Sequence, residues 1–285
     1  MKLEEQGEWT QVIKPKSKWY NINLREIWDY RDLIMIFVRR DIVSTYKQTV
    51  LGPLWLFLGP LFTVAVYTLV FGKIAGMSTD GVDPVLFYLA GTTMWNYFQS
   101  CITATSNTFI NNAGIFGKVY FPRLVSPISI VISNLMKFGI QMLLFLCVFF
   151  YQFLYGDLQI YPNKTLFFLP FLIFMMGGIA LGMGIIVSSL TTKYRDLSYF
   201  ISFGVTLLMF TSPVIYPVSK IPLEYQPFLQ FNPIAPLIEA FRYSFTGYGT
   251  FTFNGLLYSF IFMLAVLGFG IVLFGKTEKT FMDTV

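Results

Sequence analysis

Long apolar stretches alternate with short polar segments along most of the chain. They predict six membrane-spanning helices, at about residues 53–71, 84–110, 128–155, 166–190, 199–218 and 253–274. Helices of this length, which rise about 1.5 Å per residue, match a bilayer hydrocarbon core of about 30 Å. The pattern therefore predicts an all-α integral membrane protein in which residues 51–285 form one six-span domain.

The N-terminal region has a different pattern. Residues 1–20 are polar and carry no apolar run, so they are expected to form a cytoplasmic tail. Over residues 21–50, apolar side chains recur every three or four positions with charged ones opposite, which predicts an amphipathic interfacial helix. Its apolar face can enter the headgroup region or pack on the protein's own cytoplasmic surface, and the spacing leaves both open.

Two local patterns refine the predicted bundle. Glycines at small-xxx-small spacing in the fourth span predict close contact with a neighbouring helix. Residues 219–252 are too polar and proline-rich to span the membrane directly. Within them, Glu239 and Arg242 are three residues apart on an expected short helix, so they share a face and are expected to pair.

The distribution of lysine and arginine predicts the orientation, because cytoplasmic segments carry the excess of these residues. With the N-terminus inside, nine lysines and arginines precede the first span, and the other inner segments hold Lys118, Arg123, Lys193, Arg195, Lys276 and Lys279. The outer segments hold only Lys73, Lys164, Lys220 and Arg242. Both termini are therefore expected in the cytoplasm.

Composition supports the membrane assignment and excludes several kinds of chemistry. The chain is 55% hydrophobic and 12% charged, and it contains no histidine, which removes the commonest general base and metal ligand. Lys137 is the single lysine or arginine well inside an apolar run, so a proton-driven or sodium-driven mechanism is not indicated. No phosphate-binding loop is present. We expect no catalytic site, cofactor, metal or nucleic-acid partner in this chain, and any energy must come from another one.

Four stretches resemble a known family. They are R-R-D at 39–41 with Y-K-Q-T-V-L-G-P-L-W at 46–55, K-V-Y-F-P-R-L-V-S-P at 118–127, S-P-V-I-Y-P at 212–217, and N-P-I-A-P-L-I-E-A-F-R at 232–242. In this order they resemble ABC-2 type permeases that export polysaccharides, most of all those that export O-antigen. Capsule and teichoic acid exporter permeases are close relatives, and none of the four stretches distinguishes the substrate.

The resemblance implies the partners and the location. It implies two copies of this chain with two copies of an ATP-binding cassette subunit, which binds the ATP and magnesium. The cargo would be a glycan on a polyprenyl pyrophosphate, moved across the bacterial cytoplasmic (inner) membrane, with membrane lipids around the chain. Short re-entrant helices would lie between spans five and six, and the 111–127 loop with the amphipathic helix would meet the ATPase.

Four sets of residues follow as site candidates. ATPase docking is assigned to Arg39, Arg40, Lys118, Phe121, Pro122 and Arg123, although these also suit a simple interfacial turn. A glycan path is assigned to Trp55, Phe62, Tyr67, Trp95, Phe98, Tyr199, Phe203, Phe210 and Tyr216, although aromatic residues also fill membrane cores and interfaces. An outer gate is assigned to Pro213, Tyr216, Pro217, Asn232, Pro233, Glu239 and Arg242, and a hinge to Gly52, Pro53 and Pro60.

Two other functions remain open at this point. An ABC-2 exporter of small lipids or drugs would share the same fold. A membrane channel or scaffold that works without an ATPase is the second alternative.

Overall fold

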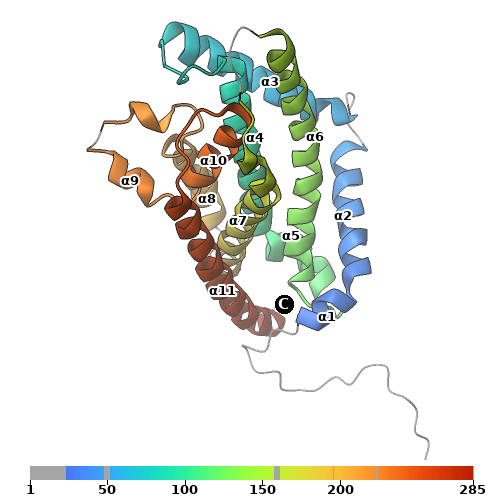
Figure 1. Ribbon diagram of the computed structural model, residues 1–285. Coiled ribbons are helices and arrows are strands. Elements are labelled where there is room, and N and C mark those ends of the chain that lie inside the picture. Colours follow the sequence, from blue (N-terminus) through green and yellow to red (C-terminus); the bar gives the residue numbers. More distant parts are fainter. Residues whose placement is uncertain (1–23, 48–51, 157–160, 195, 223, 285) are drawn as a thin grey trace, which may run out of the picture.

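The computed structural model describes residues 24–47, 52–156, 161–194, 196–222 and 224–284, and all regular elements in these ranges are helical (Figure 1). The longer helices are α2 (Arg31–Tyr46), α3 (Trp55–Tyr67), α4 (Pro84–Ser106), α6 (Val125–Tyr155), α7 (Leu169–Thr191), α8 (Leu197–Phe210) and α11 (Phe253–Thr284). The shorter ones are α1 (Leu24–Asp29), α5 (Thr108–Phe116), α9 (Gln226–Gln230) and α10 (Ala235–Thr246). The predicted tail over residues 1–20 lies outside the described residues.

The centre of the bundle is α4 with α7, and α6 and α11 pack on either side of this pair (Figure 1). Glycines of α7 allow the close approach, as the sequence predicts. A Cβ atom at Gly184 would lie 2.6 Å from Cβ of Thr105 on α4, and one at Gly182 would lie 2.9 Å from the backbone nitrogen of Leu267 on α11. The small residues therefore bring α7 against two neighbours at once, which maximises van der Waals contact.

Four helical stretches are long and apolar enough to cross a membrane: Gly52–Ile74, Val125–Tyr155, Lys164–Thr191 and Phe253–Glu278. The predicted second and fifth spans look different. Helix α4 is long but carries polar residues in its second half, and α8 ends at Phe210 because a proline-containing turn follows it. The six-span count therefore remains a prediction.

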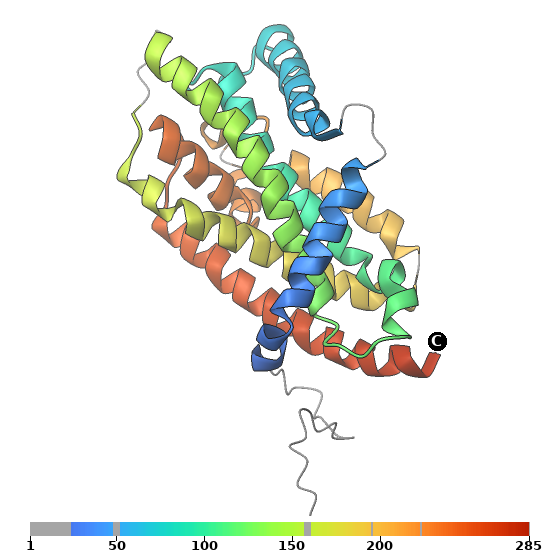
Figure 2. The same ribbon diagram turned by 90° about the vertical axis from the view of Figure 1, so that its right-hand side faces the viewer.

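The N-terminal amphipathic segment forms two helices, α1 and α2, with a break at Tyr30. Helix α2 packs along α6 (Figure 2) and buries Ile34, Phe37 and Val38 against residues of α5, α6 and the loop between them. Met35 and Ile36, on its other side, are exposed. One apolar face of α2 thus packs on the protein itself, while Met35 and Ile36 remain uncovered on the other side.

The predicted hinge residues lie at the beginning and middle of the first span. Gly52 opens a 3-10 turn (Gly52–Leu54) with a φ of +50°, a backbone conformation that glycine adopts without strain. Pro53 is exposed in that turn, and Pro60 is buried inside α3, which continues through it into a π-helix (Thr68–Ile74). Most of α3 is uncovered, although it contacts α4 and α6.

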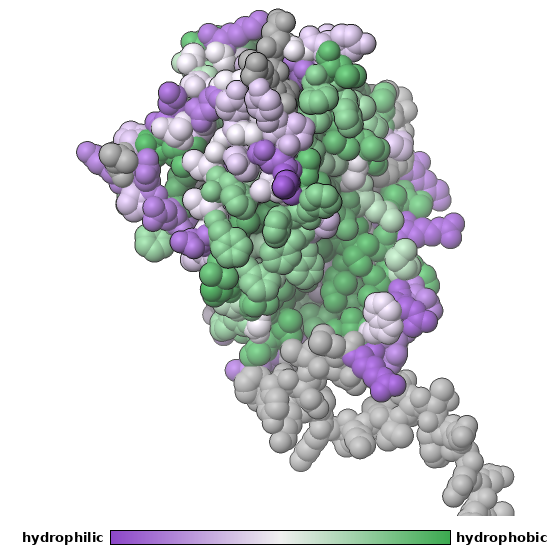
Figure 3. All heavy atoms as spheres, in the orientation of Figure 1, coloured by the Kyte–Doolittle hydropathy of each residue, from purple (hydrophilic) through white to green (hydrophobic). Residues whose placement is uncertain are grey.

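Residues 211–252 fold into short elements beside the start of α4. Helix α10 packs on α4, α7 and α11, whereas α9 projects from the bundle (Figure 1). On the face seen in Figure 3, apolar residues cover the middle of the molecule and hydrophilic residues gather toward the edges.

Candidate functional site

The predicted site residues occupy three regions. We name two of them after their arginines: the Arg242 cluster near the start of α4, and the Arg123 cluster near its end. The third is the side of the bundle where α4 lies between α8 and the pair α3 and α6. Among the described residues, no group of acidic, cysteine or histidine side chains is arranged to hold a metal ion.

In the Arg242 cluster, a fully buried ion pair ties three segments together. Glu239 and Arg242 lie one turn apart on α10, and their Oε1 and Nη1 atoms are 2.6 Å apart, as their spacing predicts. Nη2 of Arg242 donates to the carbonyl oxygen of Pro213 at 2.8 Å, and the guanidinium lies 3.7 Å from the ring centroid of Phe87 on α4. Because both side chains are at most 3% exposed, this arrangement is held without solvent.

Further contacts fix the same region. The second carboxylate oxygen of Glu239 accepts bonds from the backbone nitrogen and hydroxyl of Thr250, at 3.1 and 3.2 Å. Asn232 donates to the hydroxyl of Ser212 at 2.8 Å. Ser259 of α11 donates to the carbonyl of Pro233 at 2.7 Å. The structure thus brings five of the predicted outer-gate residues into one network, namely Pro213, Asn232, Pro233, Glu239 and Arg242.

Gly91 is part of this region, although sequence reasoning missed it. A Cβ atom here would lie 2.7 Å from the carbonyl oxygen of Val214 and 3.2 Å from Nη2 of Arg242. Only glycine lets the 211–217 turn approach α4 this closely. A lone glycine in an apolar helix gives no hint of such a long-range contact.

A cavity of about 960 Å³ lies beside the Arg242 cluster, between the ends of α8 and α9. Its lining is mainly apolar and includes Phe210, Tyr216, Pro217 and Asn232. The remaining two outer-gate residues, Tyr216 and Pro217, thus share one cavity with Phe210 of the predicted glycan path, to which Tyr216 is also assigned. Lys220 provides the cationic group of this lining.

The Arg123 cluster connects the 117–124 loop to α2 and α11. The buried Phe121 ring packs edge-on against Phe37 of α2 and Phe116 of α5, each at 5.7 Å. The Arg123 guanidinium lies 4.5 Å from the Phe116 ring, and its Nε is 3.8 Å from Oε1 of Glu278. Burial lowers the pKa of Arg123, and the Glu278 carboxylate raises it. The group stays charged, because an arginine guanidinium is not deprotonated in proteins.

The predicted docking residues are therefore divided. Phe121 and Arg123 form the interior support of the loop, Pro122 is half-buried, and Arg39 and Lys118 are exposed. Val119 and Tyr120 are 56% and 64% exposed at the loop, and sequence reasoning did not select them. The sequence does not show that Val119 and Tyr120 are exposed while neighbouring residues of the loop are buried.

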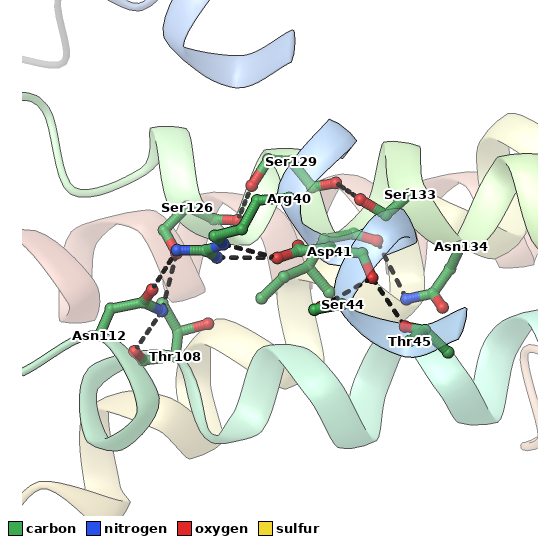
Figure 4. A network of polar contacts seen from close by, with 11 residues as sticks. Arg40, Asp41, Ser44, Thr45, Thr108, Asn112, Ser126, Ser129, Ser133 and Asn134 are labelled. Carbon is green, nitrogen blue, oxygen red and sulfur yellow. Dashed lines mark hydrogen bonds and ion pairs between the residues drawn. The ribbon is translucent and has the colours of Figure 1, made fainter. Parts of the chain in front are cut away.

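The Arg40 side chain is 40% exposed, and its guanidinium also reaches Asn112 of α5 (Figure 4). It pairs with Asp41 at 2.8 Å and donates from Nη1 to Oδ1 of Asn112 at 3.5 Å. Asn112 is buried and donates from Nδ2 to the hydroxyl of Ser126 at 3.0 Å and to the carbonyl of Thr108 at 2.9 Å. These bonds connect α2 with α5 and α6, and they were not predicted from the sequence.

The predicted glycan-path aromatics also separate by exposure. Trp55, Phe62, Tyr199, Phe203 and Phe210 are exposed, while Tyr67 and Tyr216 are half-buried. Trp95 and Phe98 are 1% and 0% exposed, so they pack in the core of the chain and present no surface of their own.

One side of α4 is polar and partly uncovered. Spacing places Asn96, Gln99, Ser100 and Thr103 on one side of the helix, which we call the polar face of α4. Ser100 is exposed and the other three are half-buried. Asn96 donates to Gln141 of α6 at 3.4 Å, and α3 and α8, which both carry exposed aromatic rings, contact α4. The hydrogen-bonding groups of α4 are thus next to two helices that expose aromatic rings.

Comparison with known proteins identifies the family. Residues 32–246 match the family described as ABC-2 type transporter. An O-antigen export system permease protein RfbA of Klebsiella pneumoniae is 30% identical over 263 residues, covering 88% of this chain and 94% of that protein. An RfbA of Myxococcus xanthus is 27% identical, covering 77% and 82%.

A more distant relative extends the comparison to another exporter. The polysialic acid transport protein KpsM of Escherichia coli is 22% identical over 247 residues, covering 86% of this chain and 93% of that protein. All these alignments extend over most of both proteins. The chain therefore belongs to the ABC-2 type transporter family.

Proposed function

We propose that this chain is the permease subunit of an ATP-driven exporter that moves a lipid-linked, O-antigen-like polysaccharide across the bacterial inner membrane. The family assignment and the names of the relatives support this proposal. The observation that carries it is the polar face of α4, which is partly uncovered on a helix that α3 and α8, with their exposed rings, both contact.

The chemistry of this side suits a sugar polymer. Polar side chains at membrane depth face a neighbouring helix or water rather than lipid. Asn96, Gln99 and Ser100 provide donors and acceptors for sugar hydroxyls, and exposed rings provide flat surfaces for the C–H faces of sugars. Many weak contacts of this kind let a polymer slide, whereas one tight site would hold it.

Completing the path requires more than one chain. We propose a second copy facing the same side, because α3 and α8, which both contact α4, expose large apolar side chains. In this arrangement α4 and α8 complete six spans, α9 and α10 re-enter from the outer side, and both termini are cytoplasmic. Residues 1–20, 21–50 and 51–285 then serve as tail, interfacial helix and membrane domain.

Energy in this proposal comes from two separate ATP-binding cassette subunits, which bind ATP and magnesium. Their docking surface is the exposed part of the 117–124 loop with Lys118, Val119 and Tyr120. Helix α2 contacts the same cluster through Phe37, so it can transmit displacement toward α3. Gly52, Pro53 and Pro60 then act as the hinge.

Reconstitution with the ATP-binding subunit tests the proposal. Ser100→Trp places a bulky side chain on the polar face and is expected to reduce ATP-dependent export of a glycolipid at least about tenfold, which corresponds to about 1.4 kcal/mol. Cys147→Trp, at an exposed position of α6, is the matched control and keeps wild-type export. Equal export by both variants would exclude this face as the path.

A further inference from the structure

Lys137 is a cation on the same side as the polar face of α4. It is half-buried on α6, within a stretch long and apolar enough to span a membrane. Gln141, one turn further on the same side of α6, accepts the bond from Asn96. Lys137 is therefore next to the hydrogen-bonding groups that join α6 to α4.

The surroundings of Lys137 leave its charge uncompensated. Across the described ranges, no acidic side chain lies within 4.0 Å of its ammonium group and no hydrogen bond engages it. Asp41 is the acidic group that acts on it electrostatically. The Asp41 carboxylate, however, already accepts two hydrogen bonds from Arg40, at 2.8 and 3.0 Å.

An unpaired lysine at this depth needs an explanation. A charged group inside a membrane span is costly, and such groups mark substrate pathways or pair with a partner. Snorkelling is a weak alternative, because Lys137 is the thirteenth residue of α6 and thus about 18 Å from the start of that helix. Gln99, on the polar face of α4, adds a half-buried amide donor that suits an anion.

We propose that Lys137 contacts the phosphate of a glycolipid as this substrate enters the path. This inference rests on the proposed function and names the chemical class that the site recognises: a phosphate group carried between a lipid tail and a sugar. Such a group matches the charge of the ammonium and leaves Asp41 with Arg40. The aromatic rings and the polar face of α4 then contact the sugars that follow.

The test compares two short glycolipids that differ only at the link. One joins lipid and sugar through phosphate, and the other through an uncharged ether. The measured quantity is the concentration that half-maximally stimulates ATP hydrolysis by the reconstituted permease with its ATP-binding subunit. Variants are Lys137→Gln, Lys137→Arg and, as a matched loss of one charge at an exposed site, Lys193→Gln.

We expect Lys137→Gln to raise this concentration about tenfold for the phosphate-linked glycolipid and to leave it unchanged for the ether-linked one. Lys137→Arg and Lys193→Gln should both stay near wild type. Equal effects of Lys137→Gln on the two glycolipids would overturn the inference while leaving the proposed function intact.

Two controls separate the remaining sources of anion. The same measurement is repeated in phosphatidylglycerol and in phosphatidylcholine vesicles. If Lys137→Gln changes the half-maximal concentration only in phosphatidylglycerol vesicles, the contact belongs to membrane headgroups and the glycolipid assignment is overturned. A correctly assembled wild-type complex that neither glycolipid stimulates and that transports neither would overturn both the inference and the proposed function.

Discussion

The two ends of α4 carry the same three groups in different states. Each has an arginine over a phenylalanine ring and beside a glutamate: Arg242 with Phe87 and Glu239, and Arg123 with Phe116 and Glu278. In the first cluster the charged atoms are 2.6 Å apart and both side chains are at most 3% exposed. In the second they are 3.8 Å apart, and the glutamate side chain is 35% exposed.

This difference separates a fixed end from an adjustable one. A buried pair with further hydrogen bonds cannot open without leaving a charge in a medium of low polarity. A longer, partly solvated pair contributes little and can exchange partners. The Arg242 cluster is therefore suited to hold the 211–217 turn and α10 in place, and the Arg123 cluster is suited to respond to a docking subunit.

Breaking the buried pair should have the largest effect. Glu239→Gln leaves Arg242 uncompensated, and we expect a loss of about 3–5 kcal/mol in the free energy of unfolding. The measurement is the thermal unfolding midpoint in detergent. Glu239→Leu combined with Arg242→Met should recover much of the loss. If Glu239→Gln unfolds at the wild-type temperature, the ion pair is not held away from solvent as described.

Gly91→Ala should have the next largest effect, because the added Cβ atom meets the Val214 carbonyl oxygen at 2.7 Å. We expect a loss of about 1–3 kcal/mol in the free energy of unfolding, as for other overpacked sites. Gly139→Ala is the control, since a Cβ atom there has open space within 4 Å. Similar unfolding midpoints for the two variants would show that the turn and α4 can separate.

Asn112→Leu interrupts the connection from Arg40 to Ser126 near the adjustable end. We expect a loss of about 1 kcal/mol in stability, because net hydrogen-bond contributions are of that size. The more informative measurement is the ratio of glycolipid exported to ATP hydrolysed, which should fall because α2 is less firmly connected to α5 and α6. Asn134→Leu is the matched control, because the amide of Asn134 bonds to Ile130 within α6, and it should preserve the ratio. An unchanged ratio in Asn112→Leu would show that this network does not couple ATP hydrolysis to export.

Glu278→Arg should have the smallest effect on stability, below about 1 kcal/mol, because the Glu278 side chain is 35% exposed whereas Arg123 is buried. Its effect on function should exceed that, since the 117–124 loop loses its contact with α11 and ATP hydrolysis stimulated by the substrate falls. Pairing it with Arg123→Glu should restore the stimulation. If the single variants keep wild-type stimulation and the double variant loses it, the functional role of this ion pair would be contradicted.

Periodicity and spacing predicted much of this architecture and little of its long-range contacts. The i, i+3 spacing correctly predicted the Glu239 and Arg242 pair, and glycine spacing predicted the close packing of α7. The Pro213 carbonyl and Gly91 could not be predicted, because they come from segments far apart in the chain. Local periodicity says which residues share a face but not which neighbour covers it.

The aromatic residues illustrate the same limit. Trp95 and Phe98 look equivalent in sequence to Phe203 and Phe210, yet the first two are buried among neighbouring helices and the last two are exposed. Helix α8 leaves its aromatic side open, whereas α4 is covered by α6, α7 and α10 on all but its polar face. The exposure of each ring is decided by this packing.

In the proposed function, the polar face of α4 lines the path of the polysaccharide. This proposal can be tested by the rate at which a water-soluble maleimide labels Ser100→Cys in a Cys147→Ser background, in which the native Cys101 is fully buried. The complex is measured empty and with a glycolipid stalled during export by a bulky end group. We expect labelling in the empty complex and strong protection in the stalled one, and equal labelling in both states would contradict the account.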